Sequence, residues 1–241
     1  MHKMEGKNYE QVMAHLPKAR VEGLFPFYNT GVDYCGPVDI KTKKGHGGSV
    51  YKGWISVFIC MASKAIHLEL VTGLSTEDFI AALRRFVSRR GRPAHMFCDN
   101  GSNFVAAQKE LKILYNQQQL QQQLQESEFD GKIKFHFNPP SAPHQGGIWE
   151  SAVKGAKFHL KRVMNGRLLT YEELETVLCA VEACLNSRPL SKLNDDPSDL
   201  SPLTPGHFLI GRPLNAIVDP DLTELQENRL SHYQLCQKIV L

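Results

Sequence analysis

The uncharged apolar run WISVFICMA, residues 54–62, is the feature that most limits how this chain can fold. It is far shorter than the ~20 apolar residues that a helix needs to cross a bilayer, so we expect no membrane span. A continuous apolar run of this length is typical of a strand that is buried on both faces. The next segment, AIHLELV, alternates apolar and polar residues and predicts a neighbouring strand.

The patterns around this run predict an α/β domain. The segment NTGVDYCGP, residues 29–37, predicts a strand that Gly36-Pro37 ends, and it completes a three-stranded meander with the two strands that follow. Two more strands are expected at 95–99 and 133–137. Helices are expected to begin at about Ser75, Asn103, Gly147 and Thr170, of which the first and last open capping boxes. This order predicts a mixed five-stranded sheet flanked by helices.

The size and composition suit one large domain. A chain of 241 residues, 42% of them hydrophobic, can bury a sizeable core and is too apolar for global disorder. We expect an extended lead-in over residues 1–26, a core over 27–190 and a loop-rich C-terminal extension over 191–241. The first twenty residues lack the apolar core of a signal peptide, and the six cysteines lack zinc-site or disulfide-framework spacing. We therefore expect a chain that is not secreted, keeps its thiols reduced and holds no zinc.

Three acidic residues stand where the predicted elements meet. Asp33 interrupts one apolar strand, Asp99 ends another, and Glu150 lies at the start of a helix. Each alone could be a surface or capping group, but adjacent first and fourth strands would make them neighbours. Carboxylates held together repel one another unless they are protonated or neutralised by a cation. Oxygen ligands of this kind favour Mg²⁺ or Mn²⁺, and two such ions suit displacement at a phosphodiester.

The helix that carries Glu150 also carries a row of lysines. At 100° per residue, Lys154, Lys157 and Lys161 fall within about 40° of Glu150, while the apolar residues fall on the opposite side. A lysine row is either a solvated face or a surface for phosphates, and its place beside the carboxylates favours binding of a nucleic-acid backbone. A second basic row, between Arg84 and Arg92, is interpreted as a solvated helix face rather than as a DNA contact or a nuclear-import cluster.

At these residues the sequence resembles a retroviral-type integrase catalytic core, and most closely the integrases of Bel/Pao long-terminal-repeat retrotransposons. The resemblance is carried by the segments LPKARV (16–21), NTGVDYCGP (29–37), CDNGSNF (98–104), NPPSAPHQGGIWESAVKGAK (138–157), LNSRPL (185–190) and SPLTPGHFLIGRP (201–213). It implies an RNase H-like fold and an Asp-Asp-Glu catalytic triad at Asp33, Asp99 and Glu150, which binds Mg²⁺ or Mn²⁺.

The same resemblance implies DNA integration, in which 3′-end processing is followed by strand transfer. The implied partners are the ends of the element's DNA, the target duplex and further copies of the chain, and the implied place of action is the nucleus, or the cytoplasm and the nucleus. Lys154 and Lys157 match DNA-holding positions, and the loop from Asn138 to Gly147 matches the mobile active-site loop. Asn138, His144 and Gln145 in this loop are candidate DNA contacts, and a role in loop conformation is the alternative for His144 and Gln145.

Two departures keep other functions open. The interval between Asp99 and Glu150 is longer than in retroviral integrases, and its surplus coincides with the glutamine tract at 117–125. The zinc-binding module expected before the core and a full basic barrel after it are not found. The alternatives are a nuclease or cut-and-paste transposase of the same fold, and a host-retained or fragmentary copy that binds DNA or partners without catalysis.

Overall fold

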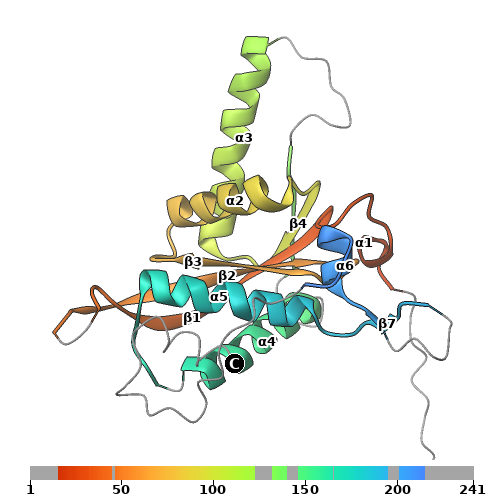
Figure 1. The fold of residues 1–241 in the computed structure, drawn as a ribbon. Helices are drawn as coiled ribbons and strands as arrows, with labels where there is room; N and C mark the ends of the chain where they lie inside the picture. Colours follow the sequence, from red (N-terminus) through yellow and green to blue (C-terminus); the bar gives the residue numbers. More distant parts are fainter. Residues whose placement is uncertain are drawn as a thin grey trace, which may run out of the picture.

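The computed structural model describes residues 16–44, 47–122, 132–139, 146–164, 166–194 and 201–214. Its main sheet contains six strands, of which five follow the order β3-β2-β1-β4-β5 and the short sixth strand, β6, pairs with β1 (Figure 1). These strands are β1 (Asn29–Lys41), β2 (Val50–Cys60), β3 (Ile66–Val71), β4 (His95–Cys98), β5 (Lys134–Phe137) and β6 (Leu169–Thr170). A separate two-stranded sheet pairs β7 (Ser191–Lys192) with β8 (Pro202–Leu203).

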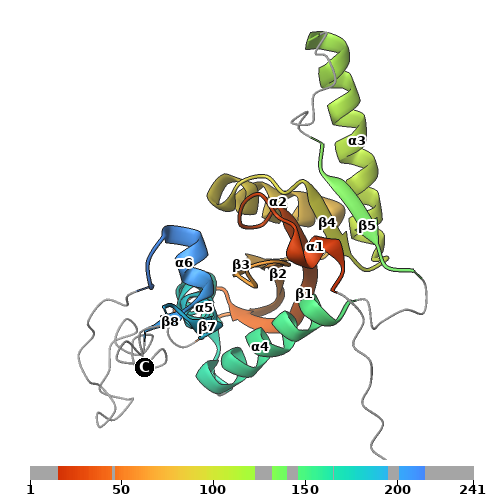
Figure 2. The same cartoon turned by 90° about the vertical axis from the view of Figure 1, so that its right-hand side faces the viewer.

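Helices cover both faces of the main sheet. They are α1 (Lys18–Val21), α2 (Thr76–Arg90), α3 (Ser102–Gln122), α4 (Gly147–Met164), α5 (Tyr171–Asn186) and α6 (Pro205–Ile210). Helix α2 lies on one face and helices α4 and α5 lie on the other (Figures 1 and 2). Two apolar cores result, one between the sheet and α4 and α5, the other between the sheet and α2 and α3.

Strand directions agree with the predicted mixed sheet. Strands β1, β2 and β3 form an antiparallel meander, whereas β4 runs parallel to β1 and β5 runs parallel to β4. The first and fourth strands are therefore direct neighbours, as the interpretation of the three carboxylates requires. Both predicted capping boxes are also present, because Ser75 and Thr170 each accept a backbone N–H three residues on.

The prediction that β1 ends at Gly36-Pro37 is wrong. The strand continues to Lys41, and its register with β2 shifts between Cys35 and Val38. Proline cannot donate a ladder hydrogen bond, but a bulge tolerates it. Gly36 is required there because its φ is +142° and a Cβ would lie 2.9 Å from Cδ1 of Trp54. The dipeptide therefore bends the strand without ending it.

Strand β3 is an edge strand whose six residues are all buried. Side chains from α5 and α2 take the place of a neighbouring strand. The Asn186 amide bonds both the N–H and the C=O of Ile66, Glu182 accepts the N–H of Leu68, and Arg85 donates to the C=O of Leu70. An open edge that would otherwise invite another strand is thus covered.

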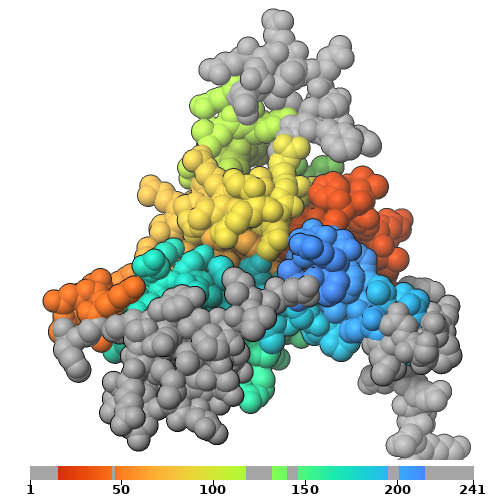
Figure 3. All heavy atoms as spheres, in the orientation of Figure 1, coloured from red at the N-terminus to blue at the C-terminus, as the bar shows by residue number. Residues whose placement is uncertain are grey.

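Helix α3 extends the molecule away from the sheet. It continues from Ser102 into the glutamine tract as far as Gln122 and stands above α2 in the space-filling view (Figure 3). The surplus length between Asp99 and Glu150 is thus at least partly taken up by this helix. None of the helices in the described residues is long and apolar enough to span a membrane.

Candidate active site

Asp33 lies on β1, where it pairs with Val57 of β2, two residues beyond Gly31, the last residue of β1 that pairs with β4. It is half-buried, and its Oδ1 accepts the backbone N–H of Tyr34 at 2.7 Å. Burial raises the pKa of this carboxyl, and the charges of Asp99 and Glu150 raise it further. The Tyr34 N–H and the charge of Lys157 act in the opposite direction without cancelling the rise. Asp33 is therefore an acid whose negative charge is incompletely balanced.

Asp99 directly follows Cys98, the last residue of β4, and β4 lies beside β1 in the sheet. The parallel register pairs Gly31 with Phe97, and Asp33 and Asp99 each stand two residues further along their chains. Side chains two residues apart along a strand share a face, so this register brings the two carboxylates toward each other. Asp99 is exposed, and its Oδ1 accepts the backbone N–H of Gly101 at 2.9 Å, which orients the side chain at the turn into α3.

Glu150 is brought to the same place by a close contact between α4 and β1. A Cβ at Gly31 would lie 2.8 Å from Cε3 of Trp149, so the ring can rest on the strand only because residue 31 is glycine. Trp149 is buried by this contact, and the next residue, Glu150, is half-buried near Asp33. Gly146 lies against the Glu150 carboxylate, since a Cβ there would be 2.9 Å from Oε1.

The three acids thus form an open group. Both other charges act on Asp33, although the described residues contain no ready-made cluster of three or more histidine, cysteine, aspartate or glutamate side chains around one metal position. Mg²⁺ usually keeps several waters and takes one or two protein carboxylates. The residues present fit such an open oxygen site better than a closed cage.

One side of α4 is basic and the other is apolar, as the helical spacing predicts. Lys154, Lys157 and Lys161 are exposed. The residues buried against the sheet are Trp149, Ala152, Val153, Ala156 and Leu160. Lys157 also lies close enough to lower the pKa of Asp33. The middle lysine of the row therefore lies near Asp33, and the row as a whole runs along the exposed side of the helix.

Of the three predicted loop contacts, one lies within the described residues. Asn138 is half-buried just after β5, where its N–H donates to the C=O of Cys98 at 3.1 Å and its C=O accepts from Nδ2 of Asn100 at 2.6 Å. It therefore stands beside the segment that carries Asp99. His144 and Gln145 lie outside the described residues.

Sequence reasoning missed a second acidic group at β3. His67 and Glu69 are each only 1% exposed, and Nε2 of His67 lies 2.8 Å from Oε1 of Glu69. Nδ1 of the same ring lies 3.2 Å from Oε2 of Glu182 on α5. Arg85 and Arg89 form ion pairs with Glu69, and Arg90 forms one with Glu182.

The interpretation of the arginines as a solvated face is therefore incomplete, because Arg85, Arg89 and Arg90 remain partly or largely exposed but also form ion pairs with buried or largely buried acids. Burial alone would raise the pKa of Glu69, but hydrogen bonds from His67 and Arg85 lower it below its usual value. A sequence signal was available, because Arg85 and Arg89 stand four residues apart on one side of a helix. Their partners could not be assigned without the packing of α2 on β3.

The fold of this chain is similar to that of solved structures. No protein-family model and no curated protein matches the chain. A chain of the simian T-cell lymphotropic virus intasome in complex with PP2A regulatory subunit B56 gamma matches with a TM-score of 0.55 and 16% identity over 88% of this chain. The fold is RNase H-like. This match covers 64% of the intasome chain, so the present chain spans less than two thirds of its length.

Two isolated domains are also similar. The HTLV-2 integrase catalytic core domain in complex with magnesium is 20% identical over 78% of this chain and 99% of its own length, with a TM-score of 0.49. The catalytic core domain of BIV integrase is 16% identical over 77% of this chain and 95% of its own length, with a TM-score of 0.47.

Proposed function

We propose that this chain is the core of an integrase-type, metal-dependent polynucleotidyl transferase, which cleaves and joins DNA phosphodiesters by 3′-end processing and strand transfer. One observation carries the proposal. Asp33 on β1, Asp99 after β4 and Glu150 on α4 lie close enough that the charges of Asp99 and Glu150 help to raise the pKa of Asp33. A group of acids with so little compensating positive charge suits a divalent cation.

Asp33, Asp99 and Glu150 would hold two Mg²⁺ or Mn²⁺ ions between them and the substrate phosphate. Bound ions of this kind activate the attacking oxygen and stabilise the leaving oxygen. Contacts within the chain orient these three side chains. The Tyr34 and Gly101 N–H groups orient Asp33 and Asp99, and the contact of Trp149 with Gly31 sets the position of Glu150.

DNA would approach along the lysine row of α4. Lys154, Lys157 and Lys161 would contact backbone phosphates, because ammonium groups bind them without regard to sequence. Asn138, His144 and Gln145 would contribute contacts from the segment that precedes α4. The substrates would be the element's DNA ends and a target duplex, handled by several copies of the chain in the nucleus, and a Bel/Pao retrotransposon is the proposed origin.

The experiment is an oligonucleotide nicking and strand-transfer assay with Mg²⁺ or Mn²⁺. Asp99→Asn keeps the size of the side chain but removes a charge, and we expect it to lower both activities by about 100-fold or more. The matched control is Glu110→Gln, an exposed position on α3. Equal activity of Asp99→Asn and the wild type would refute the triad. Nicking without joined products would instead identify a nuclease of the same fold.

A second candidate is a copy that binds DNA without catalysis. It is favoured by the open arrangement of the acids, since no closed three-ligand group exists in the described part of the chain. Duplex binding by the wild type, with no nicked or joined product in either metal, would establish it. Turnover that depends on Asp99 would exclude it.

A further inference from the structure

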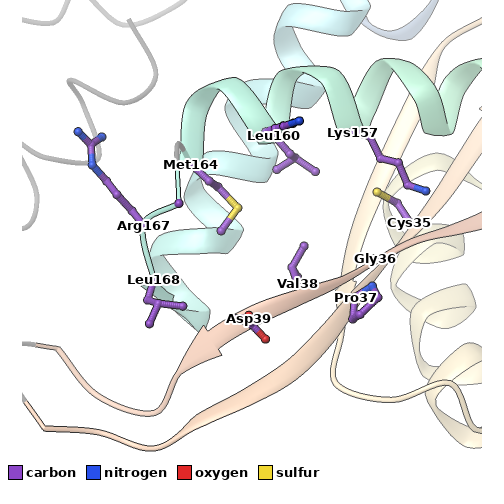
Figure 4. A pocket seen from close by; sticks show the side chains of 12 residues that line it. Cys35, Gly36, Pro37, Val38, Asp39, Lys157, Leu160, Met164, Arg167 and Leu168 are labelled. Atoms are coloured by element: carbon purple, nitrogen blue, oxygen red, sulfur yellow. The ribbon is translucent and has the colours of Figure 1, made fainter.

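A hollow of about 420 Å³ lies between the C-terminal half of α4 and the part of β1 that follows Cys35 (Figure 4). We call it the α4–β1 hollow. It exists because β1 bends at the bulge between Cys35 and Val38, just where α4 passes over the strand. Its volume falls within the range of about 300–1,000 Å³ that is usual for small-molecule sites.

The hollow joins an apolar interior to positive charge. Val38 and Met164 extend into it from opposite sides, and Leu160 lies between α4 and the strand (Figure 4). Cationic side chains stand at its borders: Lys157 points toward Cys35 at one end (Figure 4). Lys161, also on α4, is a second basic residue of the lining. The single carboxylate of the lining, that of Asp39, turns away from α4 (Figure 4). This combination suits a ligand with an apolar ring and an attached anion.

The hollow also adjoins the three acids. Cys35 stands two residues after Asp33 on the same strand, and the charge of Lys157 acts on both of these groups. A strand of DNA whose phosphate lay at Asp33 would therefore bring a neighbouring nucleotide to the open end of the hollow.

We infer that the α4–β1 hollow is a nucleotide subsite, which takes the base of one unpaired nucleotide next to the reacting phosphate. The inference rests on the proposed function. The base would lie against Met164, since a thioether makes favourable contacts with aromatic rings, and against Val38 and Leu160. Lys157 and Lys161 would hold the flanking phosphates. A base that is unpaired can enter such a pocket, whereas a paired base stays in its stack.

The test measures binding rather than catalysis. Fluorescence anisotropy in EDTA compares the wild-type chain on a blunt duplex, on duplexes with one unpaired nucleotide at the 5′ or the 3′ end, and on the same overhangs with an abasic nucleotide. We expect one overhang to bind roughly two- to tenfold more tightly than the blunt end, and the abasic version to lose that gain. Millimolar dAMP is added in a further arm to compare a free nucleotide with a nucleotide in DNA.

Two substitutions on α4 supply the protein side of the test. Met164→Glu places a carboxylate in the hollow and should abolish the overhang preference while keeping blunt-duplex binding. Phe158→Glu changes an exposed residue of the same helix outside the hollow and should keep the preference. The abasic comparison needs no variant, so it remains decisive even if Met164→Glu does not fold.

Each outcome bears on the inference. Equal binding of blunt, overhang and abasic ends by a chain that still nicks and joins DNA would overturn the subsite and leave the proposed function intact. A preference that survives Met164→Glu would place the nucleotide elsewhere and overturn it too, as would tight binding of dAMP without any overhang preference. Failure to bind any duplex would overturn both the subsite and the proposed function.

Discussion

Two acidic groups on one sheet differ in how their charge is balanced. At β3, Glu69 and Glu182 are paired with His67 and three arginines. At the junction of β1, β4 and α4, the charges of Asp99 and Glu150 instead raise the pKa of Asp33, and the opposing charge of Lys157 does not cancel the rise. We call these the balanced cluster and the open acid group.

The difference bears on what each group of acids contributes to stability. Burying a charge is costly unless it is paired, so the balanced cluster stabilises the packing of α2 and α5 on β3 only while all of its members are present. The open acid group gains nothing from mutual repulsion, which folding must tolerate. A bound cation would neutralise the charges of these acids and remove the cost of holding them together.

The largest expected effect is a difference in stability between two substitutions, each of which replaces a carboxylate by an amide of the same size. Glu69→Gln should lower the free energy of unfolding by about 3 kcal/mol, because it leaves His67, Arg85 and Arg89 without their acid. This value is at the lower end of the range for buried pairs, since the two arginine side chains are 42% and 44% exposed and can be hydrated. Asp99→Asn should change the free energy of unfolding by less than about 0.5 kcal/mol. Urea unfolding measures both, and equal losses would break the contrast.

The pH dependence of stability should follow the balanced cluster. The pKa values of Glu69 and Glu182 lie below their usual 4.5, so their stabilisation is present above pH 4.5 and is lost as the pH falls further. The pKa of His67 lies above its usual 6.5, because the two glutamates outweigh its burial. Its contribution is complete below pH 6.5 and is lost as the pH rises through the folded value. His67→Gln should remove the alkaline loss in thermal unfolding across this range, and an unchanged profile would count against the assignment.

A smaller effect concerns DNA binding. Lys154→Ala combined with Lys157→Ala should weaken duplex binding at all sequences and make the salt slope shallower by up to about 1.8, at about 0.9 per phosphate contact. Lys109→Ala combined with Lys112→Ala, two exposed positions on α3, provides the matched control. An equal loss of slope in both double variants would mean that α4 is no special DNA surface.

The smallest effect is a shift in one titration. Because the charge of Asp99 raises the pKa of Asp33, Asp99→Asn should lower it, and Lys157→Ala should raise it. Carbon-13 NMR of the Asp33 carboxyl follows both changes. A pKa that moves in neither variant would show that the three groups are not coupled.

The elements were predictable where local signals agree with the packing. The two capping boxes, the alternation in β5 and the two sides of α4 each follow from a few neighbouring residues. Gly36-Pro37 misled because the dipeptide that ends strands also makes bulges, and only the pairing with β2 distinguishes the two. The length of α3 was open for a similar reason, since a glutamine tract can continue a helix or fray.

The acids of the candidate site could be singled out from the sequence because Asp33 interrupts an apolar strand, Asp99 follows one and Glu150 lies in the first turn of a helix. What could not be predicted is the balance of charge around any acid. Glu69 and Arg85 are sixteen residues apart, and Glu182 is more distant still. Which acids are neutralised depends on how helices pack on the sheet, so the balanced cluster was hidden from sequence reasoning.

The most direct test of the proposed metal site is whether the free energy of unfolding rises with the concentration of a divalent cation. Unfolding of the wild type and of Asp99→Asn is followed while Mn²⁺ is increased, with Glu110→Gln as the control. The account predicts that the wild type and the control gain about 1.4 kcal/mol when Mn²⁺ reaches ten times its dissociation constant, and that Asp99→Asn gains far less at the same concentration. An equal gain in Asp99→Asn, or no gain in the wild type, would contradict the claim that the open acid group binds a divalent cation.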